Sequence, residues 1–289
     1  MKKVFVVIIN YKSEDVIGNA VRSFDEDNID VEIVILDNGS TEDTYDELRK
    51  ELGRDIDIIR TESNLGYSAG ANYTVNYLRE KYENIEYLFF FNPDALATKN
   101  MIGTLYEGLN KNKSAAAVSP LILDMDGNKW FSGTAINWKN CTIDNNPQNM
   151  NNVNNVTEID VFNGCAVLID AEIFFEVGMF NEDMFIYYDE PFLSMEFQKK
   201  GYINLYEPNA VAYHMISHSS SPHSTFKTYL MTRNHISFFK KYGKSKSFLC
   251  PYRRPLRMKL FFLKRFMFKN IYHSFLGMYD EFIGKKGAP

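Results

Sequence analysis

The chain has 289 residues, of which 45% are hydrophobic, 15% aromatic and 24% charged. This length and composition favour a globular chain with a sizeable core and argue against a disordered one. The three cysteines, Cys141, Cys165 and Cys250, are too few and too scattered for a disulfide framework or a cluster of thiolate metal ligands. No uncharged apolar run approaches the ~18–20 residues that span a bilayer, and the apolar run at residues 4–9 lacks a signal-peptide cleavage site. We therefore expect a protein of the reducing cytoplasm.

The net charge of −5 conceals a strong asymmetry along the chain. Residues 1–226 carry a net charge of −18, whereas residues 227–289 carry +13. An acidic body with a basic tail is typical of a protein whose tail meets an anionic surface. Because the body is acidic and the excess of basic residues is confined to this tail, a nucleic-acid-binding protein is the least favoured class.

Five short apolar runs are continuous rather than alternating, as expected of strands buried on both faces of a parallel sheet. They cover residues 4–9, 33–36, 56–59, 87–91 and 115–118. Segments with helical spacing lie between them, over residues 13–24, 42–52, 69–82 and 99–110. This alternation predicts an open α/β sheet with right-handed crossovers.

The second half is less regular. Residues 137–155 are rich in asparagine and show almost no apolar periodicity, which predicts a long surface loop or flap. Further elements are expected over residues 161–169, 171–178, 191–200 and 203–206, before the basic tail. We predict a boundary at residue 224, followed by a basic, amphipathic, helical extension over residues 225–289.

Polar turns follow four of the predicted strands, and ligands of open parallel sheets bind at such carboxyl ends. The candidate binding residues in these turns are Asn10, Tyr11, Asp37, Asn38, Asn64, Gly66 and Asn92. The first turn contains no glycine, so a dinucleotide-binding fingerprint is absent. The four turns together predict one pocket rimmed by hydrogen-bonding groups.

Asp94 follows a proline, which keeps Asn92 extended and fixes the direction of the carboxylate. One or two protein carboxylates suit Mg²⁺ or Mn²⁺ when diphosphate oxygens and water supply the other ligands. The alternative is that Asp94 caps a short helical turn.

Six stretches, in the same order, resemble the inverting family 2 glycosyltransferases with the GT-A fold, over roughly residues 4–220. They are IINYKSEDVIGNAVRSF, VILDNGSTEDT, ESNLGYSAGANYTV, NPD, the segment from GCAVLID to FQKKGY, and EPNAVAYHMISHSS. NPD stands where the family carries its aspartate-x-aspartate metal motif, in the form common among rhamnosyltransferase-like members. The resemblance implies a GT-A-type, mostly parallel sheet flanked by helices, and a nucleotide-sugar-binding and catalytic domain over residues 1–224.

The resemblance also implies roles for individual residues. Asp37 would contact the base or ribose of the donor nucleotide, near Tyr11 and Asn64. Asp94 would hold the divalent cation, and His214 would be a second contact to the metal or the diphosphate, or else a structural histidine at a strand end. Asn72 would line the sugar pocket or merely begin a helix.

Two departures from the family pattern concern these roles. Asn92 replaces the first aspartate of the metal motif, which leaves less charge for a cation. The usual Glu-Asp pair of the acceptor segment is inverted to Asp189-Glu190. Glu190 then takes the position of the catalytic base, with Asp189 before it, although acidic residues also favour a helix start for electrostatic reasons alone.

The implied reaction moves a sugar from a pyrimidine nucleotide diphosphate donor, dTDP-rhamnose or a UDP-sugar, to a saccharide acceptor that is lipid-linked, in bacterial surface polysaccharide synthesis. One carboxylate base suffices for a single displacement with inversion. Two alternatives stay open. A sugar nucleotidyltransferase would carry a glycine- and arginine-rich first loop, which is absent here, and a non-catalytic homologue would account for both departures.

In the tail, one helical stripe is formed by Leu256, Leu260, Leu263, Met267 and Ile271. Cations and aromatic residues beside such a stripe are typical of a helix that lies in a membrane interface. We therefore expect peripheral attachment to the anionic inner face of the cell membrane. The alternative is that the stripe packs on the catalytic domain or on a second subunit of a homodimer.

Overall fold

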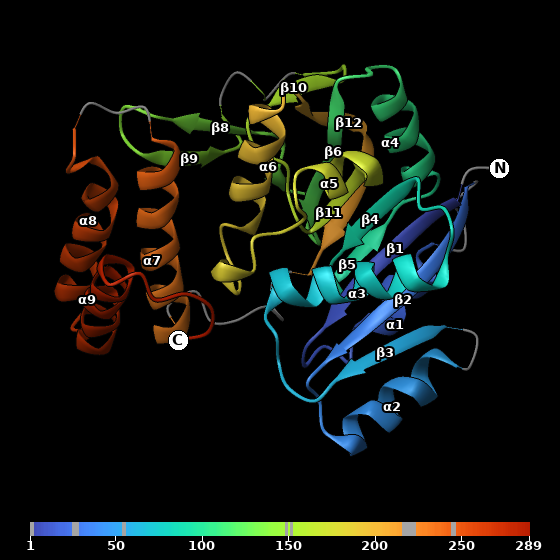
Figure 1. The fold of residues 1–289 in the computed structure, drawn as a ribbon, viewed down its shortest axis with the longest axis horizontal. Coiled ribbons are helices and arrows are strands. Elements are labelled where there is room, and N and C mark those ends of the chain that lie inside the picture. Colours follow the sequence, from blue (N-terminus) through green and yellow to red (C-terminus); the bar gives the residue numbers. More distant parts are fainter. Residues whose placement is uncertain are drawn as a thin grey trace.

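The computed structural model describes residues 3–24, 29–53, 56–147, 150, 153–215, 224–243 and 247–289. Its centre is a ten-stranded sheet in the order β10-β12-β6-β11-β4-β1-β2-β3, with β5 beside β12 and β7 beside β6 (Figure 1). The sheet is mainly parallel, but β11 runs antiparallel to both of its neighbours. The predicted α/β class is confirmed.

The first half follows the predicted alternation. Its elements are β1 (Lys3–Asn10), α1 (Ile17–Arg22), β2 (Asp30–Asn38), α2 (Glu42–Leu52), β3 (Asp57–Thr61), α3 (Tyr67–Lys81), β4 (Tyr87–Phe91), β5 (Ala95–Ala97), α4 (Met101–Asn110) and β6 (Ala115–Asp124). All five predicted strands are present. The first helix is shorter than predicted, because only residues 17–22 are helical.

The second half contains more strands than its sequence suggested. Its elements are β7 (Lys129–Phe131), β8 (Thr134–Asn137), β9 (Thr142–Asn145), β10 (Thr157–Ile159), β11 (Ala166–Asp170), α5 (Ala171–Glu176), a 3₁₀ helix (Glu182–Met184), α6 (Asp189–Lys199), β12 (Ile203–His214), α7 (Thr225–Tyr242), α8 (Cys250–Lys264) and α9 (Phe268–Phe282). Strand β12 continues to His214 through an irregularity between Glu207 and Val211, where polar residues interrupt the apolar pattern.

The prediction of a structureless loop over residues 137–155 is wrong for its first part, where β8 and β9 form a hairpin. Asparagines here serve as internal hydrogen-bonding groups rather than as loop residues. Asn146 accepts from the backbone N–H of Ser132 at 2.5 Å and donates to the carbonyl of Trp130 at 3.0 Å. The β8–β9 hairpin was therefore missed because its residues show little apolar periodicity, and because asparagine side chains rather than apolar ones link it to its surroundings.

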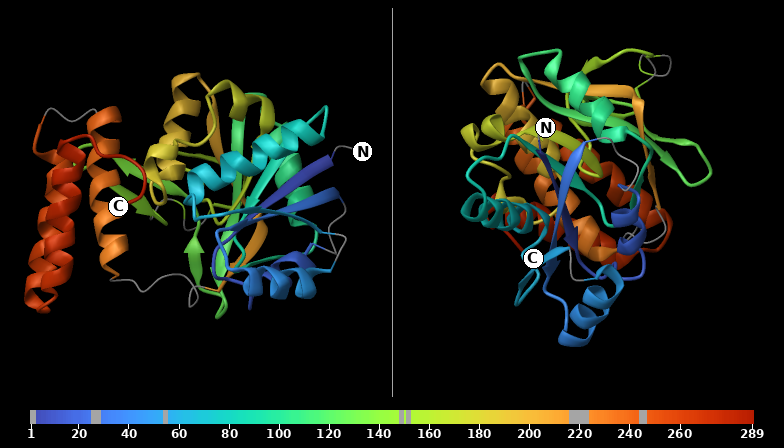
Figure 2. Two further views of the ribbon diagram at one scale, coloured as in Figure 1. Left: turned by 60° about the horizontal axis from the view of Figure 1, so that its bottom comes forward. Right: turned by 90° about the vertical axis from the view of Figure 1, so that its right-hand side faces the viewer.

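The core lies on both faces of the central sheet. Alternate residues of β1 point to opposite sides: Val4, Val6 and Ile8 pack with α1, α2 and α4, whereas Phe5, Val7 and Ile9 pack with α3, α5 and α6. A third cluster joins the β8–β9 hairpin to α6 and α7. Figures 1 and 2 show α7, α8 and α9 together at one end of the molecule, with α7 nearest the sheet.

The tail differs from the predicted single stripe. Phe266 adopts a left-handed conformation with φ of 56° between α8 and α9, so the chain forms two helices. Leu256, Leu260 and Leu263 are exposed on α8, but Ile271 belongs to α9, and Met267 precedes it. The five residues therefore do not form the one stripe that was predicted.

A disulfide joins Cys141, after β8, to Cys250, at the start of α8. Nothing in the spacing of the cysteines pointed to this single bridge, because its partners are 109 residues apart in the sequence. Cys165 is free and buried. The few, scattered cysteines therefore no longer indicate that the protein belongs to a reducing compartment, because two of them form a disulfide.

We predict that reduction lowers the stability of the protein by about 2–4 kcal/mol, because the bridge restricts the unfolded chain. Thermal unfolding of the wild type with and without reductant measures this effect. Cys141→Ser should unfold at the temperature of the reduced wild type, and reductant should not change that temperature. The unfolding temperature of Cys165→Ser should still fall when reductant is added. A wild type that does not respond to reductant would contradict the assignment.

Candidate active site

Asn10 and Asp37 lie side by side where β1 and β2 end, and both are fully buried. Nε of Arg60 lies 3.4 Å from Oδ2 of Asp37. Burial raises the pKa of Asp37, which the positive charge of Arg60 opposes. Glu14 was not predicted, yet its carboxylate accepts from Nδ2 of Asn10 at 3.3 Å and from the Ser40 hydroxyl at 3.4 Å. The structure thus brings the first two predicted turns together.

Asn38 and Asn64 form the wall of this region. The Asn38 amide donates to Oδ1 of Asn64 at 3.2 Å and to the carbonyl of Gly66 at 3.0 Å. Its oxygen accepts from the backbone N–H of Leu65 at 2.9 Å. These bonds use the side chains to shape the turn. Tyr11, in contrast, is 44% exposed, with Nζ of Lys12 at 5.2 Å from its ring centroid.

Gly66 and Asn72 connect α3 to the segment before α6. Gly66 has φ of +82°, and a Cβ there would lie 2.4 Å from the carbonyl oxygen of Phe185, so no larger residue fits. Asn72 donates to the carbonyl of Phe180 and to Oε1 of Glu182, both at 2.9 Å. The Asn72 amide is thus engaged within the protein, and Asn72 lies inside α3 rather than at its start.

The two predicted metal residues lie together. Oδ1 of Asp94 is 3.2 Å from Nε2 of His214, and both side chains are buried. The ring of Trp130 packs against His214 at 4.6 Å between centroids. Within the described ranges, no group of three or more His, Cys, Asp or Glu side chains could hold a metal ion. Among the described residues, Asp94 and His214 are therefore the two that could bind a cation here.

The fit to a cation can be tested on the histidine. Nδ1 of His214 is buried and makes no hydrogen bond to a described residue, whereas Nε2 faces Oδ1 of Asp94 at 3.2 Å. A buried polar atom without a partner is costly, and imidazole nitrogen together with carboxylate oxygen is a suitable donor set for a divalent ion. The pair formed by Asp94 and His214 therefore fits a metal site. Asn92 supplies backbone bonds to this turn: its N–H donates to the carbonyl of Cys165 at 2.9 Å.

Asp189 and Glu190 begin α6. Asp189 is buried and accepts a short hydrogen bond from the Ser68 hydroxyl. Burial, together with the negative charge of Glu190, raises the pKa of Asp189 to about 7. Glu190 is half-buried, its pKa is also raised by burial, and its carboxylate lies against Gly164, where a Cβ would be 2.6 Å from Oε1.

Gly164 and Cys165 connect this pair to the metal residues. Gly164 touches Glu190, and the carbonyl of Cys165 accepts from Asn92, two residues before Asp94. Burial raises the pKa of the Cys165 thiol, and the charges of Asp94 and Glu190 raise it further. Both carboxylates are therefore close to the same short segment.

The chain before α6 is in an unfavourable conformation. Phe185, Tyr187 and Tyr188 have φ of 66°, 70° and 70°. Each left-handed non-glycine residue costs about 1–2 kcal/mol. Such a segment persists only when other groups hold it.

Helix α7 holds this segment through three consecutive residues that were not predicted. The Asn234 amide donates to the carbonyls of Met184, Ile186 and Tyr187 at 3.0, 3.1 and 2.8 Å. Nη2 of Arg233 donates to the carbonyls of Asp183 and Met184 at 3.2 and 3.1 Å. The available signal was the polar triplet RNH inside the apolar run YLMTRNHISFF.

The third residue, His235, binds the side chain that precedes Asp189. The Tyr188 hydroxyl lies 2.6 Å from Nδ1 of His235 and accepts from Nη1 of Arg254 at 3.4 Å. Burial and the positive charge of Arg254 together lower the pKa of His235 to about 3. The imidazole is therefore neutral near pH 7, and the Tyr188 hydroxyl can donate its proton to Nδ1.

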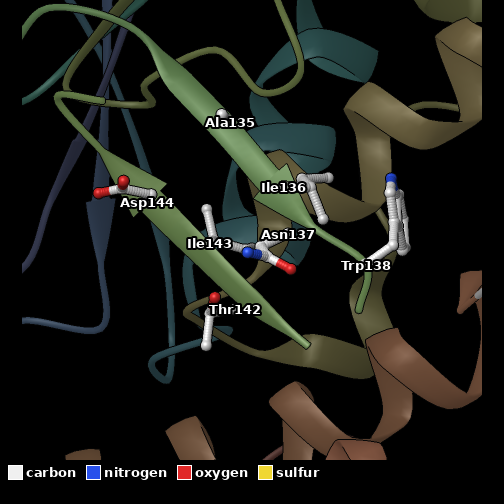
Figure 3. A pocket seen from close by; sticks show the side chains of 7 residues that line it. All are labelled: Ala135, Ile136, Asn137, Trp138, Thr142, Ile143 and Asp144. Atoms are coloured by element: carbon white, nitrogen blue, oxygen red, sulfur yellow. The ribbon is translucent and has the colours of Figure 1, made fainter. Parts of the chain in front are cut away.

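A pocket of about 610 Å³ opens at the β8–β9 hairpin (Figure 3). Its lining residues are Ala135, Ile136, Asn137, Trp138, Thr142, Ile143 and Asp144. The ring of Trp138 stacks on Phe238 of α7 at 6.1 Å between centroids. None of the predicted site residues lines this pocket.

The family model described as "Glycosyl transferase family 2" matches residues 5–175, which is more than half of the chain. The chain belongs to glycosyltransferase family 2. The low-salt glycan biosynthesis hexosyltransferase Agl10 of Haloferax volcanii is 29% identical over 191 residues, which cover 64% of this glycosyltransferase and 58% of that protein. The N-acetylglucosaminyl-diphospho-decaprenol L-rhamnosyltransferase of Mycobacterium tuberculosis is 23% identical over 210 residues, covering 66% and 68%. This glycosyltransferase thus spans less than two thirds of the Haloferax relative.

Solved structures show the same fold. GalNAc-T7, solved with UDP, GalNAc and Mn²⁺, aligns with a TM-score of 0.63 at 17% identity, over 83% of this chain and 48% of that one. The mannosyltransferase PcManGT of Pyrobaculum calidifontis, solved with GDP-Man and Mn²⁺, aligns with a TM-score of 0.56 at 15% identity, over 97% and 75%. The predicted GT-A fold is confirmed, and the comparisons do not support the sugar nucleotidyltransferase alternative.

We predict that Asp189 makes stability depend on pH. An aspartate in an unfolded chain has a pKa near 3.9, whereas that of folded Asp189 is about 7. Between these values the folded state keeps a proton that the unfolded chain has lost, so this stabilisation is complete below pH ~4 and disappears as the pH rises through ~7. Asn resembles the protonated carboxyl, so the wild type should match Asp189→Asn at pH ~4 and be less stable at pH ~8, by a few kcal/mol.

Urea unfolding of both proteins across this pH range measures the difference. The variant Asp46→Asn changes an exposed carboxylate of α2 and should run parallel to the wild type. A stability difference between wild type and Asp189→Asn that does not change with pH would show that the raised pKa is wrong.

Proposed function

We propose that this glycosyltransferase acts with inversion and uses Glu190 as the base that deprotonates the acceptor hydroxyl. The observation that carries the proposal is the contact of one segment, Gly164–Cys165, with both Glu190 and the turn that ends in Asp94. A base and a diphosphate site must lie on either side of the reacting carbon. The raised pKa of Glu190 makes the carboxylate a stronger base than an exposed one.

Asp94 and His214 would hold a divalent cation together with the donor diphosphate. When bound, such an ion stabilises the negative charge of the leaving nucleoside diphosphate. Asn10 and Asp37, at the ends of β1 and β2, would contact the nucleoside. One base without a second nucleophilic carboxylate supports a single displacement, in which the proton of the acceptor hydroxyl passes to Glu190.

The donor and acceptor are proposed by analogy. The name of the mycobacterial relative specifies an L-rhamnosyl group and a diphosphate-linked lipid acceptor. We propose dTDP-rhamnose or a UDP-sugar as donor, and a lipid-linked saccharide of bacterial surface polysaccharide synthesis as acceptor. A transfer assay with dTDP-rhamnose, UDP-sugars and GDP-mannose tests this choice, and turnover with GDP-mannose alone would overturn it.

A lipid-linked acceptor places the reaction at a membrane surface. No helix in the described part of the chain is long and apolar enough to cross a bilayer. We propose that the enzyme binds the inner face of the cell membrane from the cytoplasm. Fractionation of cells should find it with membranes, from which high salt releases part of it.

We predict that Glu190→Gln loses roughly 100-fold or more in turnover, because the amide cannot accept the proton, while donor affinity changes little. Asp94→Ala should abolish transfer and weaken the effect of Mg²⁺ or Mn²⁺ on donor binding. The exposed residue Glu158 supplies the control Glu158→Gln, which should match the wild type. If Asp189→Asn rather than Glu190→Gln abolished turnover, Asp189 would be the base.

A second prediction concerns the hydrogen bonds by which α7 positions Asp189 and Glu190. Asn234→Ala removes three hydrogen bonds from the segment before α6, and a displacement of about 1 Å can cost roughly 100-fold in rate. Turnover should therefore fall by at least tenfold in the folded protein, with donor affinity unchanged. The control is Asn204→Ala on β12. This change removes a buried amide that donates to the carbonyl of Asp160 at 3.1 Å. Equal losses of turnover in both variants would contradict a positioning role.

A further inference from the structure

Helix α9 is packed with its polar side inward. Nδ2 of Asn270 donates to Oγ1 of Thr228 at 2.8 Å, and the hydroxyl of Ser274 lies 3.2 Å from that of Thr232. Asp280 accepts from the Tyr229 hydroxyl at 2.7 Å. Between them is Gly277, where a Cβ would lie 2.6 Å from the carbonyl oxygen of Tyr229, so the backbones of α7 and α9 are in close contact.

The opposite side of α9 is aromatic and exposed. It carries Phe268, Tyr272, Phe275, Tyr279 and Phe282, at spacings of four, three, four and three residues. Each of these side chains is more than half exposed, and Phe282 reaches 77%. The stripe extends over about 21 Å at 1.5 Å per residue. A helix with small and polar residues inside and aromatic residues outside is the reverse of one designed for water.

The neighbouring helix α8 continues this surface. Leu256, Leu260 and Leu263 are exposed by 51%, 61% and 52%. We call these three leucines and the five aromatic residues of α9 the outer face. Figures 1 and 2 show α8 and α9 beyond α7, on the side away from the central sheet.

Cations border the outer face. Exposed lysines and arginines on and between the two helices are Arg253, Arg257, Lys264, Arg265 and Lys269. No aspartate or glutamate occurs from residue 247 to residue 279. The surface therefore combines apolar area with a single sign of charge.

We propose that the outer face binds the surface of an anionic phospholipid bilayer. Phenylalanine and leucine side chains enter the boundary between headgroups and acyl chains, tyrosine hydroxyls stay at the headgroups, and the cations meet anionic lipids. A second copy of the chain fits less well, because a two-fold dimer places each face against itself and brings like charges together. The inference deepens the proposed membrane attachment by assigning it to the outer face, and it rests on the proposed function only for the nature of the acceptor.

The test uses the full-length protein and vesicles of phosphatidylcholine alone or mixed in equal parts with phosphatidylglycerol. We expect co-sedimentation with the anionic vesicles, partial release by salt and little binding to phosphatidylcholine. The variant Lys264→Gln/Arg265→Gln/Lys269→Gln should bind the anionic vesicles roughly a hundredfold more weakly at low salt, since each cation contributes a few-fold. The control Lys50→Gln/Lys99→Gln/Lys113→Gln removes three exposed cations elsewhere and should bind much more strongly than that variant.

The apolar part is tested with Phe268→Ser/Tyr272→Ser/Tyr279→Ser, which should bind at least tenfold more weakly while its unfolding temperature is kept. The control Tyr73→Ser/Met125→Ser removes exposed apolar side chains of the catalytic part and should bind like the wild type. Absence of binding to anionic vesicles at low salt, or equal weakening in variants and controls, would overturn the proposal.

Light scattering addresses the second copy. A dimer that becomes a monomer in the aromatic variant, without vesicle binding by the wild type, would assign the face to self-association and overturn the proposal. Transfer to a water-soluble acceptor is measured separately. Its loss with vesicle binding intact would concern the proposed function and not the lipid surface.

Discussion

The arrangement of the candidate site depends on one constraint, the left-handed conformation of the chain before α6. Three residues there, Phe185, Tyr187 and Tyr188, have positive φ. The hydrogen bonds of Asn234 and Arg233 to the surrounding carbonyls compensate this cost. The carbonyl of Phe185 in the same segment accepts a hydrogen bond from the N–H of Tyr67 at the start of α3. Three elements therefore contact this segment: the turn that follows β3, helix α6 and helix α7. The positions of Asp189 and Glu190 follow from this junction.

The sheet and the ends of its strands were predictable because continuous apolar runs and polar turns are local properties of the sequence. Parallel pairing then placed Asn10 beside Asp37, and family resemblance selected Asp94 and His214, which the structure brings within 3.2 Å. The residues that were missed act across long separations. Asn234 reaches the carbonyl of Tyr187 from 47 residues away, and Ser68 reaches Asp189 from 121 residues away. The triplet RNH marks a polar interruption of an apolar run, but no local pattern reveals which distant groups it contacts.

The tail shows how a correct composition can still yield a wrong arrangement. Spacing selected a stripe that continues through residue 267, because periodicity alone does not reveal a reversal of the chain. The left-handed residue Phe266 ends that stripe, and the true apolar side of α9 is offset from it. The polar residues Asn270, Ser274 and Asp280 were the useful signal, since they mark the side that packs on α7.

The position of α7 in the chain has a consequence for biosynthesis. The strands of the sheet are complete at His214, but Arg233, Asn234 and His235 leave the ribosome later. Until they do, the segment before α6 lacks the hydrogen bonds that stabilise its positive-φ conformation. A nascent chain can therefore form its sheet before Asp189 and Glu190 reach their final positions. The candidate site is completed only when α7, in the last third of the chain, packs against it.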